Sequence, residues 1–301
     1  MSRPLRYIVA SRSGLFLVNE ARWKRVAEGQ YFGVTVRGQE IYCFEAATDA
    51  EKRVGRIVRY RLADETLIEP LPLVEGLDNG CHQVDFFDGA FFVVDTYNQA
   101  ILEFDEDWQL AARHRPLPPA AFKQWTQGYV HMNSLLGRGR TIFLMLHKGG
   151  PKGTGERSEI LVLDRAFRID RRLPLDGYGC HDIVELEGGR LLCCDSQSGR
   201  LIHHDGDPVP IDELMTRGLA VSPDEIAVGS SLFDERPHRL LIPGFVTFLD
   251  RSFNRIGRLH LPAAPTQIRR LDGEDLSLSQ PRPWQHASAV AAGDPAQEKA
   301  G

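Results

Sequence analysis

The chain has 301 residues, of which 42% are hydrophobic and 26% are charged, and its formal net charge at pH 7 is −5. This composition is ordinary for a folded globular protein. No stripe of Lys and Arg and no zinc-finger or RNA-binding motif is present, so we do not expect nucleic acid as a partner.

Two features of the sequence predict where the protein works. No run of about 18 apolar residues is present, and no secretory apolar region follows the first residues, so we expect neither membrane insertion nor secretion. The cysteines number five, which is odd, and Cys193 and Cys194 are adjacent in one predicted strand and so point to opposite faces. Free thiols are therefore expected, and together these features predict a cytoplasmic protein.

The N-terminal segment predicts three short strands, over residues 7–10, 15–18 and 23–26. A fourth strand that would complete the unit is missing there, and residues 266–271 near the other end of the chain supply one. We therefore expect the C-terminal strand to pair with the N-terminal blade. Such pairing closes a ring of sheets and removes their free edges.

Five further units follow in chain order, each read as short strands with alternating apolar residues. Their predicted strands are 33–36, 40–44, 56–61 and 67–73; 84–87, 90–94, 100–104 and 108–113; 134–136, 141–146 and 160–164; 183–186, 190–194 and 201–204; and 218–221, 225–228, 240–242 and 248–249. The fourth of these units is short, which indicates a blade reduced in its outer part.

One phrase recurs at the start of these units and sets their spacing. It reads Gly-Cys-His at 80–82, Tyr-Val-His at 129–131 and Gly-Cys-His at 179–181, so that successive histidines are 49 and 50 residues apart. Related openings at 31–34, 217–221 and 266–268 bring the number to six. A repeat of this period with almost no helical periodicity predicts an all-β, six-bladed β-propeller over residues 1–279, followed by a disordered tail over 280–301.

The recurring histidines suggest a site. The innermost strands of a propeller run in the same direction around its channel, so residues at the same offset lie at one mouth. His82, His131 and His181 would thus converge from three successive blades, which is the geometry of a catalytic metal site with three protein ligands. We expect a divalent transition metal there, Zn or Fe, with Arg217 binding an anionic substrate group and His131 taking part in catalysis. Gln83, Asn133 and Asp182 directly follow the histidines and are candidates for orienting the rings.

Other interpretations of the same residues stay open. A histidine at the start of a strand is usually a half-buried polar residue bonded to a nearby carbonyl. The pocket could also be polar and metal-free, with one histidine acting as a general base. Cys81 and Cys180 precede histidines, but adjacent residues rarely form a nucleophile and its base, so we expect them to be core thiols.

The residues also resemble known propellers. The segment from His82 to Ile101 resembles an NHL-type repeat, whose Asp-Xaa-Xaa-Asn turn is missing from the units that open at His131 and Arg217. The phrases at 130–135, 217–220 and 227–231 are similar to blade openings of a little-characterised bacterial propeller family, over most of the chain between the second and the fifth of the five units. That resemblance implies the propeller fold and brings no established activity.

Two better-understood six-bladed groups supply an analogy. The peptidyl-hydroxyglycine amidating lyases hold a zinc on three channel histidines with an arginine beside it, and His82, His131 and His181 match that pattern. The gluconolactonase-like group uses acidic and Asn ligands for a divalent cation, whereas the openings here supply only Asp85 and Asp182.

The sequence therefore leads to one principal hypothesis and two rivals. The first is a metal-dependent lyase or hydrolase that acts on a small, polar, anionic substrate at the channel mouth. The second is a non-catalytic propeller that binds a ligand or a partner protein on its top face. The third is a calcium-dependent lactonase, which requires a cluster of carboxylates at the channel.

Overall fold

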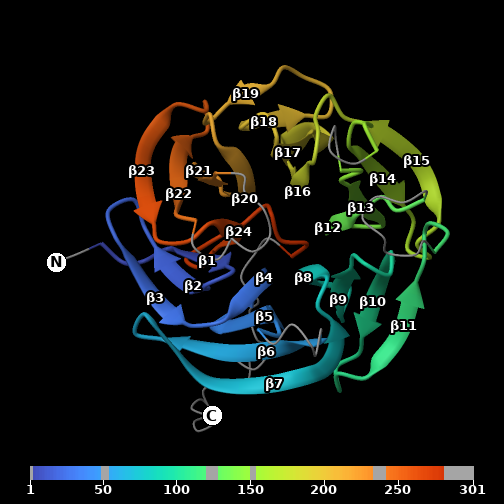
Figure 1. Cartoon of the computed structure of the whole chain (residues 1–301), viewed down its shortest axis with the longest axis horizontal. Helices are drawn as coiled ribbons and strands as arrows, with labels where there is room; N and C mark the ends of the chain where they lie inside the picture. Colours follow the sequence, from blue (N-terminus) through green and yellow to red (C-terminus); the bar gives the residue numbers. More distant parts are fainter. Residues whose placement is uncertain (1–2, 49–53, 120–127, 150–153, 233–241, 281–301) are drawn as a thin grey trace, which may run out of the picture.

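The computed structural model describes residues 3–48, 54–119, 128–149, 154–232 and 242–280 (Figure 1). These residues form six four-stranded antiparallel sheets around a central axis, as the repeat predicts. Blade 1 contains β24 (Pro265–Arg270), β1 (Tyr7–Ser11), β2 (Gly14–Val18) and β3 (Trp23–Ala27). Blade 2 contains β4 (Gln30–Arg37), β5 (Glu40–Ala46), β6 (Val54–Ala63) and β7 (Thr66–Asp78). Blade 3 contains β8 (Cys81–Phe87), β9 (Ala90–Asp95), β10 (Ala100–Phe104) and β11 (Leu110–His114).

Blade 4 contains β12 (Met132–Arg138), β13 (Thr141–Leu146), β14 (Glu159–Leu163) and β15 (Ile169–Pro174). Blade 5 contains β16 (His181–Glu185), β17 (Leu191–Asp195), β18 (Arg200–His203) and β19 (Val209–Pro210), and a short 3₁₀ turn over Glu187–Gly189 lies between its first two strands. Blade 6 contains β20 (Met215–Val221), β21 (Glu225–Ser231), β22 (Gly244–Asp250) and β23 (Arg255–Leu261). The outer strand of blade 5 has only two residues, which confirms the predicted reduction of this blade.

The ring closes as the sequence predicts. Strand β24 pairs antiparallel with β1, with Val9 opposite Ile268 and Tyr7 opposite Arg270. In the described residues the apolar core is divided into six clusters, and each lies between two neighbouring blades. Because blades pack face to face, both faces of the inner strands are buried, and Cys193 and Cys194 contribute to different clusters. All five cysteines are buried free thiols, as expected.

Some outer strands differ from the prediction. In blade 6 the segment expected to be outermost, around Phe248, belongs to the third strand β22, and the outer strand is β23. Residues 240–241 of the predicted third strand lie outside the described residues. Blade 4 gains an outer strand, β15, that the pattern did not indicate, and Trp108 lies in a turn before β11 instead of starting it. Outer strands pack on one side only, so their apolar alternation is weak: residues of β15 are almost all exposed.

Each inner strand carries a β-bulge close to its start. We call the end of the propeller where β4, β8, β12, β16, β20 and β24 begin the top face. The pairing register shifts there in all six blades, for example between Cys81 and Val84 in β8 and between Thr216 and Leu219 in β20. A bulge bends the strand and re-aims its side chains. The six bulges therefore set the direction of the residues at the top face, including His82 and Arg217.

The residues that follow the histidines form hydrogen bonds to the neighbouring blades, and their role in orienting the rings stays a prediction. Gln83 exchanges two 2.8 Å hydrogen bonds with the backbone of Leu135. Asn133 donates to the carbonyl of Cys180 at 2.9 Å. The Asp182 carboxylate accepts from the amide of Gly218 at 2.9 Å. These side chains therefore connect successive blades near the bulges of the top face.

The segment after β24 crosses the opposite end of the inner strands, the bottom face. The amide of Leu276 donates to the carbonyl of Val221 in blade 6, and the amide of Ser279 donates to the Asp85 carboxylate in blade 3, both at 2.7 Å. From blade 4, Arg138 donates to the carbonyls of Leu276 and Leu278. Residues 272–280 therefore join blades on different sides of the axis.

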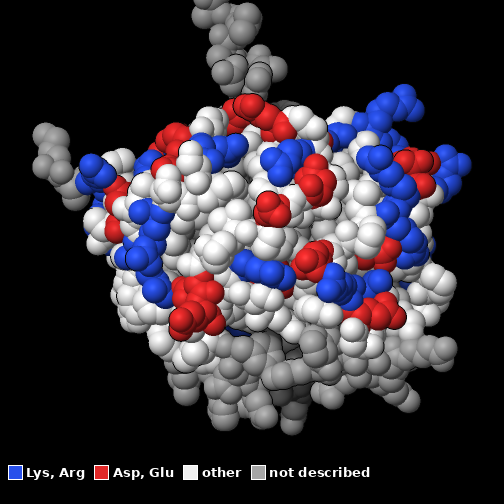
Figure 2. Space-filling view, turned by 90° about the horizontal axis from the view of Figure 1, so that it is seen from above, with Lys and Arg blue, Asp and Glu red and all other residues white. Residues whose placement is uncertain are grey.

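The outer surface is mixed in charge. Figure 2 shows one side of the molecule, on which Lys and Arg are interspersed with Asp and Glu. Among the described residues, no helix is long and apolar enough to span a membrane. The predicted tail, residues 280–301, lies outside the described residues except for its first position.

Candidate functional site

Four imidazole rings form a continuous row at the top face. The ring centroids of His82 and His131 are 4.9 Å apart, those of His131 and His147 are 4.8 Å apart, and those of His147 and His181 are 4.9 Å apart. His82, His131 and His181 are the three residues that the repeat predicts to converge. His147 is a fourth member, which the sequence analysis did not identify.

His82 and His181 are held by equivalent contacts in blades 3 and 5. The Nδ1 atom of His82 lies 2.8 Å from the Gly80 carbonyl oxygen and 3.0 Å from the Thr96 hydroxyl. The corresponding contacts of His181 Nδ1, to the Gly179 carbonyl and to the Ser196 hydroxyl, are both 2.9 Å. Because a carbonyl oxygen only accepts hydrogen bonds, each neutral ring carries its proton on Nδ1 and has Nε2 as its basic nitrogen.

Blade 4 departs from this arrangement. His147 is the first residue after β13, the place that Thr96 and Ser196 take after the second strands of blades 3 and 5. With no hydroxyl at that place, His131 Nδ1 instead contacts the hydroxyl of Tyr129 at 3.0 Å. His131 itself has φ of 54°, which is unusual for a residue with a side chain and positions its ring at the bulge.

The proton of His147 is placed differently from those of His82 and His181. The backbone amide of Gly149 donates to His147 Nδ1 at 2.9 Å. Nδ1 is thus an acceptor, and the neutral ring carries its proton on Nε2. The row therefore combines rings whose Nε2 accepts a proton, His82 and His181, with a ring whose Nε2 donates one.

The charge of Arg217 acts on the end of the row formed by blade 5. His181 is buried, and burial lowers its pKa well below the ordinary 6.5, with the charge of Arg217 as the next cause and the charges of the other three imidazoles after it. His181 is therefore neutral near pH 7. Arg217 lies in β20 at the bulge of blade 6, on the side where the sequence analysis placed it. An anionic ligand next to His181 would offset the charge of Arg217.

The site residues fit a metal ion only in part. Within the described parts of the chain, no group of three or more His, Cys, Asp or Glu side chains is arranged to hold one. His147, which is not one of the three predicted ligands, lies between His131 and His181 in the row. What favours a metal is the Nδ1 hydrogen bond of His82 and His181 to a carbonyl, which metal-binding histidines commonly make.

The two carboxylates at the blade openings take part in the framework. Asp85 accepts from the Thr35 hydroxyl at 2.8 Å and from the backbone amide of Ser279, and Asp182 accepts from Gly218. Asp182 is buried, and this burial raises the pKa of its carboxyl group. In the described residues these groups do not form the carboxylate cluster that a calcium-dependent lactonase requires.

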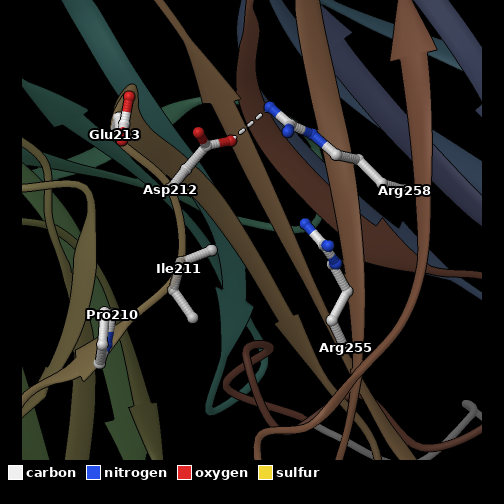
Figure 3. Close-up of a pocket in the computed structure, with 6 residues that line it drawn as sticks. All are labelled: Pro210, Ile211, Asp212, Glu213, Arg255 and Arg258. Atoms are coloured by element: carbon white, nitrogen blue, oxygen red, sulfur yellow. Dashed lines mark hydrogen bonds and ion pairs between the residues drawn. The ribbon is translucent and has the colours of Figure 1, made fainter.

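A pocket of about 450 Å³ lies elsewhere, between the link that precedes β20 and the outer strand β23. It is lined by Pro210, Ile211, Asp212, Glu213, Arg255 and Arg258 (Figure 3). The Asp212 carboxylate forms an ion pair with Arg258 at 2.6 Å and accepts from the Ser230 hydroxyl at 2.8 Å. These contacts connect the link to blade 6, so we assign a structural role to the charges that line this pocket.

The chain matches no protein-family model, and no curated protein matches it in sequence. Solved structures do match it in fold. A propeller in the crystal structure of a nidogen/laminin complex has a TM-score of 0.65 at 11% identity, covering 91% of this chain and 99% of that one. A streptogramin B lyase has a TM-score of 0.51 at 12% identity, covering 93% of each chain. A putative 6-phosphogluconolactonase from Bacteroides uniformis has a TM-score of 0.52 at 12% identity, covering 86% of this chain and 83% of that one.

These comparisons establish the fold alone. The sequence identities are low, and six-bladed propellers occur both in binding proteins and in enzymes. The function must therefore be argued from the residues at the top face.

Proposed function

We propose that the protein is an enzyme of the lyase or hydrolase type, acting on a small, polar, anionic molecule at the top face. The observation that carries this proposal is the row of four imidazoles with two different proton placements next to Arg217. Imidazole is the side chain whose ordinary pKa lies closest to neutral pH, and it serves most often as a general acid or base.

The proposed mechanism uses one imidazole as a base and another as an acid. His131 lies between His82 and His147 in the row and removes a proton, from water in a hydrolysis or from the substrate in an elimination. His147, with its proton on Nε2, returns a proton to the leaving group. His82 and His181 stay neutral on either side, and the guanidinium of Arg217 binds the substrate's anionic group and offsets the negative charge that develops during the reaction.

Turnover by matched variants tests this proposal. A panel of esters, lactones and β-substituted acids, each bearing a carboxylate or a phosphate, is offered to the wild type and to His131→Gln, Arg217→Lys and His260→Gln. His260 is an exposed histidine of the outer strand β23 and serves as the control. We expect kcat/KM to fall by about 10²- to 10⁴-fold in His131→Gln and KM to rise in Arg217→Lys, with no change in the control.

Two results would overturn the proposal. An undiminished rate in His131→Gln would remove this residue from the chemistry. Saturable binding of the panel compounds by the wild type without any conversion would instead support the rival function, a propeller that binds a ligand or a partner on its top face.

A second candidate is a metal-dependent form of the same enzyme, with Zn or Fe on His82, His131 and His181. It is favoured by the two Nδ1–carbonyl contacts, which leave Nε2 as the basic nitrogen of each ring. When bound, such an ion would activate water or polarise a carbonyl group. Metal analysis of protein purified without a histidine tag decides the matter. About one equivalent that is lost in His131→Ala supports the metal, and less than about a tenth of an equivalent in the wild type excludes it.

A further inference from the structure

A second arginine, Arg12, lies at the top face in blade 1. It is the first residue after β1, the same place that Thr96, His147 and Ser196 occupy after the second strands of blades 3, 4 and 5. Three of these four residues thus belong to the row of imidazoles or contact it directly. Ser11 fixes the turn, because its hydroxyl donates to the Gly14 carbonyl at 2.8 Å and accepts from the Ser13 amide at 3.1 Å.

Ring contacts connect Arg12 to the histidine row. Its guanidinium carbon lies 5.3 Å from the centroid of the Phe32 ring, and that ring lies 5.6 Å from the ring of His82. Phe32 occupies the bulge of β4, as His82 does in β8. The row therefore extends from His82 through Phe32 to a guanidinium, just as it ends next to Arg217 beyond His181.

The chain segments that carry Arg12 and Arg217 belong to neighbouring blades at the point where the propeller closes. Blade 1 and blade 6 are neighbours, and the start of β24 packs against the start of β20 through Gly229. A methyl group at the Gly229 position would lie 2.2 Å from the Arg217 carbonyl oxygen and 2.7 Å from Pro265, which pairs with Ser11. In a six-bladed ring, blades 1 and 6 lie across the axis from blades 4 and 3. Arg12 and Arg217 thus lie on adjacent blades. The blade of Arg12 is opposite that of His131, and the blade of Arg217 is opposite that of His82.

We propose that Arg12 and Arg217 together bind the charged part of the ligand, and that this ligand is a dianion, either a phosphomonoester or a dicarboxylate. The proposal deepens the proposed function and rests on the same site. Guanidinium groups bind carboxylate and phosphate oxygens in a bidentate manner, and two such groups match two negative charges. The rest of the ligand would then extend towards His131, on the far side of the top face.

Equilibrium binding tests the inference without any need for turnover. Isothermal titration calorimetry at constant ionic strength measures the dissociation constants of inorganic phosphate, malonate, succinate and glutarate. Acetate serves as the monoanion for comparison. The proteins are the wild type, Arg12→Gln, Arg12→Lys and Arg217→Gln. The control is Arg37→Gln, because Arg37 lies 5.0 Å from the centroid of the Phe86 ring but stands at the bottom end of β4, away from the top face.

We expect phosphate or a dicarboxylate of one preferred length to bind at least about tenfold more tightly than acetate. Arg12→Gln and Arg217→Gln should each lose about tenfold or more, Arg12→Lys should lose less, and Arg37→Gln should bind as the wild type does. Tight binding of phosphate identifies a phosphomonoester site, and a chain-length optimum identifies a dicarboxylate site.

Equal affinity for acetate and the dianions, or an effect of Arg217→Gln alone, would overturn the assignment of Arg12. Circular dichroism of each variant distinguishes a loss of binding from unfolding. The charge-conserving Arg12→Lys provides a second binding measurement at the same position. Failure of the proposed function has a different signature, because dianions would then bind as described while no panel compound is converted.

Discussion

His82 and His181 lie two blades apart, yet the two imidazole rings are held by the same pair of contacts. Each Nδ1 atom lies within 2.9 Å of the carbonyl oxygen two residues earlier and within 3.0 Å of a hydroxyl, from Thr96 in one blade and from Ser196 in the other. Repeat-equivalent residues thus have the same ring proton position, on Nδ1, as well as the same place in the fold. Blade 4, which lies between them, replaces the hydroxyl with His147 and changes the chemistry of the row.

The buried His181 predicts a dependence of stability on pH. Burial and neighbouring positive charges lower the pKa of His181 well below the 6.5 that an unfolded chain retains. As the pH falls through about 6.5, the unfolded state binds a proton that the folded state does not, so the folded protein loses stability. Above that pH the contribution is constant. Urea unfolding at pH 7.5, 6.5 and 5.5 should show this loss, and His181→Asn should reduce it. Identical pH dependence in both proteins would contradict the account.

His147→Ser would restore in blade 4 the hydroxyl that Ser196 supplies in blade 5. We expect the fold to tolerate the change, with the free energy of unfolding altered by less than about 1 kcal/mol. Turnover of a substrate identified in the panel should fall by about 10²-fold, because the ring proposed to return a proton to the leaving group is gone. Urea unfolding and steady-state kinetics measure the two quantities. Full activity in the folded variant would exclude His147 from the reaction.

Gly33 permits the close approach of blade 2 to His82. A methyl group at Gly33 would lie 2.2 Å from the carbonyl oxygen of His82, which is backbone and cannot rotate away. Gly33→Ala should therefore cost about 1 to 3 kcal/mol of stability and weaken anion binding. Gly206→Ala is the matched control, since the nearest atom there is the end of the flexible Arg190 side chain. Equal unfolding free energies for the two variants would show that the blades adjust freely.

Arg138 connects blade 4 to the segment that crosses the bottom face. Its guanidinium donates to the carbonyls of Leu276 and Leu278 at 2.5 and 2.7 Å. Arg138→Ala should destabilise the protein by about 2 to 4 kcal/mol, because these half-buried bonds to a charged group are lost together. Faster amide exchange at Ser279 should accompany the loss. Arg140→Ala, an exposed position two residues later, should change neither quantity, and a similar effect there would contradict the role given to Arg138.

The period of the repeat could be read from the sequence because each inner strand opens with a similar phrase and is buried on both faces. The outer strands were less predictable. Apolar and polar residues alternate poorly in strand β23, because only Leu259 and Leu261 are buried in it. The apolar run around Phe248 was therefore assigned to the outer strand instead of to the third strand, β22. The crossing at the bottom face uses hydrogen bonds to single groups of other blades, such as the Gly137 amide and the Asp85 carboxylate, and the sequence of residues 272–280 does not indicate those partners.

The arrangement of the candidate residues was predicted in part. The three repeat-equivalent histidines do come together, because an offset from a strand start is preserved by the fold. His147 and Arg12 were missed because each follows a second strand, at a place that holds Thr96 in blade 3 and Ser196 in blade 5. The position after the second strand is occupied by a different residue type in each of these four blades, so it shows no repeated residue in the sequence. The equivalence becomes visible only when the strands are paired.

The most direct measurement of the central claim is the response of the imidazole nitrogens to an anion, recorded by ¹⁵N NMR on labelled protein. On titration with phosphate or succinate, the ring signals of the four histidines of the row should move together and yield one dissociation constant. Those of His203 and His260, in outer parts of blades 5 and 6, should stay in place. Unchanged signals in the row, or equal movement of all histidines, would contradict the assignment of the top face as the site where this protein binds and transforms its ligand.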